Sequence, residues 1–174
     1  MFNGEVRPMD RRFAVLALAG AITAAEPASA GVSVSFANPA QFRDVDRAGG
    51  ILRPGQALVE ISRFLQRQGK RLPPGQDVEI RILDFNLAGV IDPIRPEART
   101  TRLLGSATWP SARLRYVLRE RGRVVAQAEE LVADREYLGR ALTSFASDPL
   151  RYEKNMLYEW FDARFILRQP PPPP

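Results

Sequence analysis

The feature that most limits the possible folds is a pair of long alternating segments at 111–132, SARLRYVLRERGRVVAQAEELV. Apolar and polar side chains alternate in both segments, as in β-strands with one buried face, and a glycine lies between them. A three-residue loop at 120–122 keeps one face of the hairpin apolar and sets Arg113 opposite Glu129, whereas a two-residue loop sets an apolar residue against a charged one. We therefore expect an antiparallel hairpin with the three-residue loop.

Other segments extend this hairpin into a mixed α/β pattern. Residues 31–36 (GVSVSF) alternate as a strand does, and a second strand is expected from 78 to about 87. Residues 99–104 are expected to form a short edge strand. Apolar residues recur every three or four positions in two places, which predicts helices at 55–68 and from 150 onward. The predicted fold class is α+β, with an antiparallel or mixed sheet of four or five strands and two main helices packed on one face.

The first thirty residues match an export signal. Two arginines precede the apolar run FAVLALAGAITAA, and the small-residue motif ASA follows it. The run is shorter than the roughly 20 apolar residues that span a bilayer, so we expect a cleaved peptide and no later transmembrane segment. The expected organisation is a signal peptide at 1–30, a single domain at 31–168 and a proline tail at 169–174.

The chain contains no histidine and no cysteine. Disulfides, cysteine proteases, serine–histidine triads, thiolate or imidazole zinc sites and covalent c-type haem all require one of these residues. An enzyme built from this chain would have to use carboxylates, hydroxyl groups, arginines, its few lysines or an oxygen-ligated metal. We expect no cofactor.

Asp84 and Asn86 lie in an otherwise apolar stretch, ILDFNLAGVIDP at 82–93. The stretch resembles a calcium loop at its start but has an alanine and an arginine where later ligands are needed, so we expect no metal site. As a strand, it places both polar residues on the face that begins apolar. Either a bulge near Ile82 and Leu83 exchanges the faces, or both side chains are buried, in which case Asp84 is the candidate for a perturbed carboxylate.

Four arginines of the hairpin are candidate binding residues. A stripe of cations on one face of the sheet suits phosphate or carboxylate groups of an envelope component. Nucleic acid is not expected, because the protein is predicted to be exported and the stripe lacks interleaved aromatic residues. A solvated face without a ligand is the alternative. The four residues are Arg113, Arg115, Arg119 and Arg123.

The last helix carries Arg151, Glu153 and Lys154 close together. Adjacent positions on a helix point in different directions, so Glu153 and Lys154 do not face one another as an acid–base pair would. We expect these residues to have a structural role, through pairing with Asp84 or with loop backbone.

Three motifs, in this order behind a signal peptide, resemble a bacterial family called domain of unknown function 3016. They are LDFNLAG, WPSARLRYVL and LRYEKNMLYEWF, and the resemblance runs from VSVSF at 32–36 to the final aromatic helix. It implies an exported, periplasmic protein of Gram-negative bacteria, and it supplies no catalytic residues. The family pattern has a second aspartate where this chain has Asn86, which weakens a metal or paired-carboxylate site there.

The expected function is therefore that of a periplasmic, non-enzymatic binding or envelope accessory module. Its partner would be an anionic envelope component or another periplasmic protein. The alternative is a hydrolase or lyase with a carboxylate site centred on Asp84.

Overall fold

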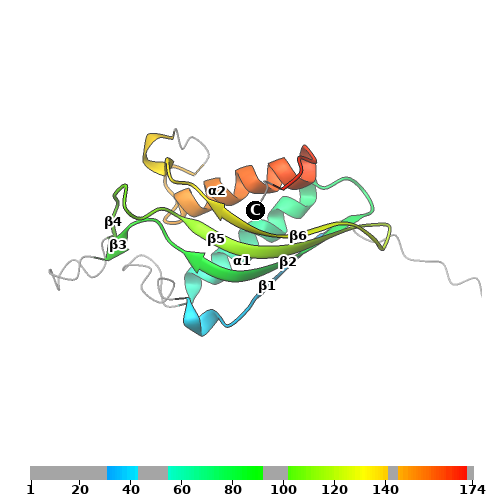
Figure 1. The fold of residues 1–174 in the computed structure, drawn as a ribbon, viewed down its shortest axis with the longest axis horizontal. Coiled ribbons are helices and arrows are strands. Elements are labelled where there is room, and N and C mark those ends of the chain that lie inside the picture. The colour runs from blue at the N-terminus through cyan, green and yellow to red at the C-terminus, as the bar shows by residue number, and fades with distance from the viewer. Residues whose placement is uncertain (1–30, 43–54, 92–101, 141–144, 172–174) are drawn as a thin grey trace, which may run out of the picture.

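A mixed four-stranded sheet organises the fold (Figure 1). The computed structural model describes residues 31–42, 55–91, 102–140 and 145–171. The strand order is β1-β2-β5-β6, with β1 parallel to β2 and the other neighbours antiparallel. The strands are β1 (Gly31–Phe36), β2 (Gln76–Asn86), β5 (Ser111–Glu120) and β6 (Arg123–Ala133).

Two helices pack on one face of this sheet, which confirms the predicted α+β class. Helix α1 (Gln56–Gln68) connects β1 to β2, and α2 (Arg151–Phe161) continues into a π-helical turn (Asp162–Ile166). Alternate residues of the strands and the apolar stripes of both helices form one hydrophobic core. None of the described helices is long and apolar enough to cross a membrane.

The helices follow the periodicity of the sequence. In α1, Leu58, Ile61 and Leu65 recur at three and four positions and are buried. Before α2, Asp148 accepts a hydrogen bond from the backbone N–H of Leu150 at 2.8 Å, which stabilises the turn that leads into the helix. The apolar residues of the helix predicted from 150 onward are buried, namely Leu150, Met156, Leu157, Trp160, Phe161 and Phe165.

Two short strands form a separate ladder at one end of the molecule. β3 (Val90–Ile91) pairs antiparallel with β4 (Arg102–Leu103). The extended segment expected at 99–104 is thus present at β4, but it pairs with β3 and not with the main sheet.

The predicted loop of the β5–β6 hairpin is wrong. Glu120 pairs with Arg123 across a two-residue turn in which Arg121 and Gly122 have φ angles of 51° and 78°. A bulge then shifts the register by one residue. The physical reason is that positive φ at both central residues gives a primed turn, whose twist matches the strands.

The corrected register sets Leu114 opposite Glu130 and Arg113 opposite Leu131, not Glu129. Glu130 is a charged residue on the buried face of the hairpin, and Arg164 neutralises it with two hydrogen bonds of 2.8 and 3.0 Å. An apolar residue therefore does face a charged one, and an arginine from beyond α2 makes that arrangement stable.

The predicted signal peptide at 1–30 lies outside the described residues. Of the predicted tail, 169–171 are described, and all three residues are exposed.

Candidate functional site

The stretch containing Asp84 is a strand with a bulge. The register between β2 and β5 shifts between Ile82 and Asp84, so Leu83 is the extra residue. The bulge exchanges the two faces, which puts Asp84 on the outer face and Phe85 in the core. Of the two alternatives that the sequence leaves open, the bulge is confirmed, and Asp84 is an exposed carboxylate.

The end of this strand lines a hollow of about 280 Å³. The wall is completed by the turn that precedes β5 and by the first residue of β5, so the motifs LDFNLAG and WPSARLRYVL meet here. The volume is just below the range of pockets that hold drug-sized ligands, and it suits a single ring-sized group. The lining residues are Asn86, Leu87, Gly89, Ala107, Thr108, Trp109 and Ser111.

Asn86 is the centre of the polar groups at the hollow. Its amide nitrogen donates to the Asp84 carboxylate at 3.1 Å and to the Ser111 hydroxyl at 3.3 Å. Both amide hydrogens are thus in use, so the side-chain carbonyl of Asn86 can accept a hydrogen bond from a ligand. The sequence candidates Asp84 and Asn86 are brought together, but only Asn86 lines the hollow.

The backbone beside the hollow is fixed by two buried or half-buried side chains. Glu153 accepts a hydrogen bond from the backbone N–H of Ala88 at 2.7 Å. Arg102 donates to the carbonyl oxygens of Ala88 and Gly89, each at 2.7 Å. Gly89 has a φ of 75°, which allows the chain to turn tightly against β4. Side chains from two other elements therefore hold the backbone of this wall by hydrogen bonds.

Trp109 supplies the aromatic surface of the hollow. The guanidinium of Arg135 lies 4.9 Å from the centre of the indole ring, within cation–π distance. This contact holds the ring in place from the segment that follows β6. The sequence alone does not indicate a role for Trp109, Thr108 and Arg135, because their proximity to Asn86 depends on how the strands pair.

The arginine stripe of the hairpin is largely neutralised. Glu129 accepts hydrogen bonds from Arg113 at 2.9 Å and from Arg115 at 2.8 Å, and these two contacts lower the pKa of its carboxyl, Arg115 contributing most. Arg119 lies 3.3 Å from Glu79. Arg123 pairs with Glu120 in register, so it belongs to the opposite face, contrary to the prediction of one stripe.

The charged residues of α2 have structural contacts. Glu153 is buried, and this burial raises the pKa of its carboxyl, while the Ala88 N–H and the charges of Arg102 and Arg151 oppose the increase. Lys154 is also buried and pairs with Asp148. The expected pairing with loop backbone is confirmed for Glu153.

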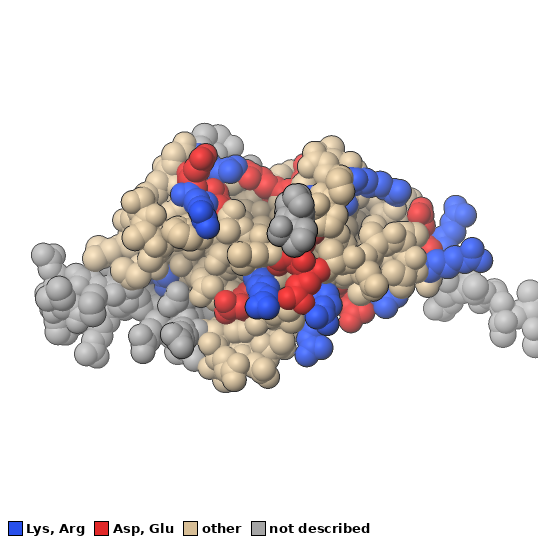
Figure 2. Space-filling view, in the orientation of Figure 1, with Lys and Arg blue, Asp and Glu red and all other residues tan. Residues whose placement is uncertain are grey.

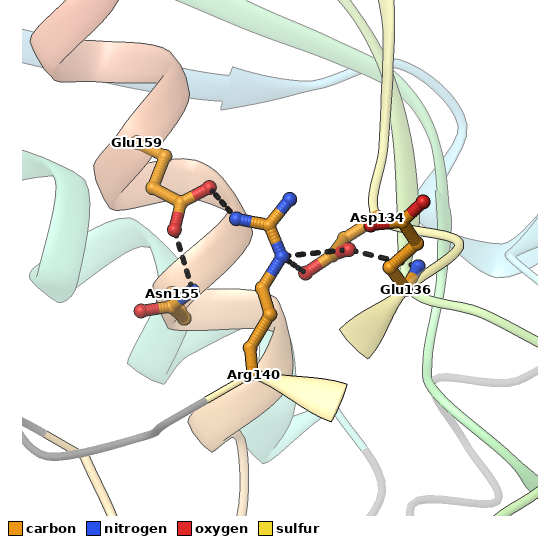
Figure 3. Close-up of polar contacts among 5 residues, drawn as sticks. All are labelled: Asp134, Glu136, Arg140, Asn155 and Glu159. Carbon is orange, nitrogen blue, oxygen red and sulfur yellow. Dashed lines mark hydrogen bonds and ion pairs between the residues drawn. The ribbon is translucent and has the colours of Figure 1, made fainter. Parts of the chain in front are cut away.

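A further network, missed from the sequence, joins the end of β6 to α2 (Figure 3). Arg140 lies between Asp134, at 3.1 Å, and Glu159, at 2.6 Å. Asp134 also accepts from the backbone N–H of Glu136, and Glu159 accepts from Asn155. Each of these groups is satisfied within the protein, which indicates a structural role.

No cluster of acidic side chains suited to a metal ion occurs within the described ranges. Asp92, the third residue of the stretch 82–93 with a side-chain oxygen that could be a ligand, lies outside those ranges.

The family model described as "Protein of unknown function (DUF3016)" matches residues 30–163. The chain belongs to this family. The match includes every residue that lines the hollow, as well as Glu153, which holds its backbone. No curated protein and no solved structure matches the chain. The geometry of this member of DUF3016 is therefore the basis on which we infer its function.

Proposed function

We propose that this protein is an exported, periplasmic binding module without enzymatic activity, and that the hollow beside Asn86 is its binding site. The observation that supports this proposal is the set of residues that line the hollow. An aromatic surface, an amide and two hydroxyl groups come together there, and among the described residues no charged side chain lines the hollow.

This chemistry suits an uncharged sugar ring of an envelope glycan. A sugar presents hydroxyl groups, which Asn86, Thr108 and Ser111 can pair with, and C–H faces, which can pack on Trp109. The exposure of Asp84 weighs against the alternative of a hydrolase or lyase, because a carboxylate in water has no dry cleft in which to act as an acid or base.

The proposal is tested by adding neutral glycan fragments from the cell envelope to the isotope-labelled protein and following amide and indole N–H signals by NMR. Binding at the hollow shifts the signals of Trp109 and Ser111 and leaves those of the buried Trp160 in place. We expect Asn86→Ala to weaken binding by about tenfold, as for one or two lost hydrogen bonds.

Ser106→Ala is the matched control, because Ser106 is exposed in the same turn and does not line the hollow. Shifts that map away from Trp109, or equal losses in the Asn86 and Ser106 variants, would contradict the site. If no fragment in the panel produces a shift, the glycan proposal is wrong.

A further inference from the structure

The two ends of the main sheet carry different surfaces. β2 begins at Gln76 and ends at Asn86, beside the hollow, so its first residue lies roughly 30 Å from the hollow. The β5–β6 turn lies at the Gln76 end, where the backbone N–H of Arg121 donates to the carbonyl of Gly75 at 2.8 Å. This end is independent of the proposed glycan site.

The last turns of both helices reach the same end of the sheet. Gly69, which follows α1, lies against the start of β1 at Val32. Arg71, two residues later, pairs with Asp162 after α2. The ends of α1 and α2 therefore lie at the same end of the sheet as the β5–β6 turn (Figure 1).

Five exposed cations occupy this region, which we call the basic end. None of their side chains makes an ion pair or a hydrogen bond with another described residue, unlike Arg71 and Arg119. Glu120 is a carboxylate in the same region, and its negative charge offsets part of the positive charge of the five cations. In Figure 2 the basic side chains gather at the right-hand end, whereas both signs mix near the centre. The five residues are Arg67, Lys70, Arg121, Arg123 and Arg168.

Large aliphatic side chains are exposed beside these cations. Leu167 precedes Arg168 and is 60% exposed, and Val124 and Val125 follow Arg123 and are 53% and 51% exposed. Cations that bind phosphate, next to aliphatic groups that enter the acyl boundary, are the two features by which a protein binds reversibly to an anionic bilayer.

We propose that the basic end docks the protein on an anionic phospholipid surface. The unpaired arginines bind lipid phosphates, and Leu167, Val124 and Val125 enter the interface between head groups and acyl chains. Docking in this orientation leaves the hollow directed away from the lipid.

The test is co-sedimentation of residues 31–174 with vesicles of phosphatidylglycerol and phosphatidylcholine, compared with vesicles of phosphatidylcholine alone. We expect binding to the anionic vesicles, weakened by salt. Arg121→Asn with Arg123→Ser should reduce affinity by at least tenfold, since each basic residue near such a surface contributes roughly fivefold. Asparagine at 121 tolerates the left-handed backbone, so the turn is kept.

Arg113→Ser with Arg115→Ser is the matched control. It removes the same charge from exposed arginines that are already paired with Glu129, and we expect affinity to remain close to that of the original protein. Leu167→Ser should reduce the part of the binding that persists at high salt.

Three results would overturn the proposal. Equal binding to both kinds of vesicle would exclude recognition of anionic lipid. Equal losses in the two double variants would show that net charge, not the basic end, governs binding. Retention on a soluble acidic polymer without binding to anionic vesicles would identify an acidic macromolecule, not lipid, as the partner.

Discussion

Among single residues, Glu153 connects helix α2 to the wall of the hollow through one buried carboxyl group. The residue is 3% exposed and its carboxyl accepts the Ala88 N–H; burial raises the pKa of this carboxyl, although the Ala88 N–H opposes the increase. The unfolded chain ionises this group near the ordinary value of 4.5, whereas the folded chain ionises it only at higher pH. The folded state then binds more protons, so this group's contribution to stability falls as the pH rises through that window.

Glu153→Gln should remove this dependence. The amide cannot ionise but keeps an oxygen that accepts from Ala88, so the free energy of unfolding should fall less steeply above about pH 4.5 than in the original protein. Urea denaturation across this range measures the difference. Parallel pH curves for the two proteins would contradict it. Glu153→Ala, which leaves the Ala88 N–H without its partner, should cost about 1–3 kcal/mol at low pH, where the carboxyl is protonated in both states.

Gly89 is a second position where one atom decides local structure. Its φ is 75°, and a Cβ added there would lie 2.4 Å from the carbonyl oxygen of Leu103. Gly89→Ala must therefore strain the backbone and displace β4, and we expect a loss of at least about 2 kcal/mol in thermal denaturation. Gly139→Ala is the control, since a Cβ there meets nothing within 4 Å. Equal losses at both glycines would show that the contact with β4 is unimportant.

At the scale of elements, the β5–β6 turn can be improved. Arg121 has a φ of 51° at the first central position of a two-residue turn, where asparagine is preferred. Arg121→Asn should raise the free energy of unfolding by up to about 1 kcal/mol, because asparagine adopts the left-handed region at a lower energetic cost than arginine does. Denaturation with urea tests this, and a destabilised variant would argue against the turn described here.

The sequence was sufficient to predict elements whose signals are local. Period-two alternation predicts β1 and the hairpin strands, and the apolar stripe predicts α1. The bulge at Leu83 was also predictable, because without it Asp84 and Asn86 would enter the core. The hairpin register was not, because matching faces by polarity assumes a regular ladder and cannot foresee that Arg164 neutralises an inward Glu130.

The candidate site was predictable only in part. Asn86 was found because a polar residue interrupts an apolar strand. Trp109 and Thr108 carry no such local signal, since they reach the hollow only when β2 pairs with β5 and the preceding turn folds over its end. The neutralisation of Arg113 and Arg115 by Glu129 likewise depends on the three-dimensional register.

For the whole molecule, ion pairs supplement the hydrophobic core in joining the α2 region to the rest of the protein. Arg164 pairs with Glu130 of β6, and Asp162 pairs with Arg71. Arg140 belongs to the same set, because it lies between Asp134, which follows β6, and Glu159 of α2 (Figure 3). Its two partners differ in burial, since the side chain of Asp134 is 6% exposed and that of Glu159 is 47% exposed.

This difference predicts unequal effects when the Arg140 network is broken. Arg140→Gln leaves the buried Asp134 carboxylate without a cation, and we expect a loss of about 1–3 kcal/mol in the free energy of unfolding. Glu159→Gln removes only the exposed pair and should cost less than about 1 kcal/mol. Adding Asp134→Asn to Arg140→Gln should restore part of the stability, because a neutral amide is easier to bury than an unpaired charge. Urea denaturation measures the free energy of unfolding of each variant. If Arg140→Gln and Glu159→Gln lose equal amounts, the buried pair of Arg140 with Asp134 contributes no more to stability than the exposed pair with Glu159.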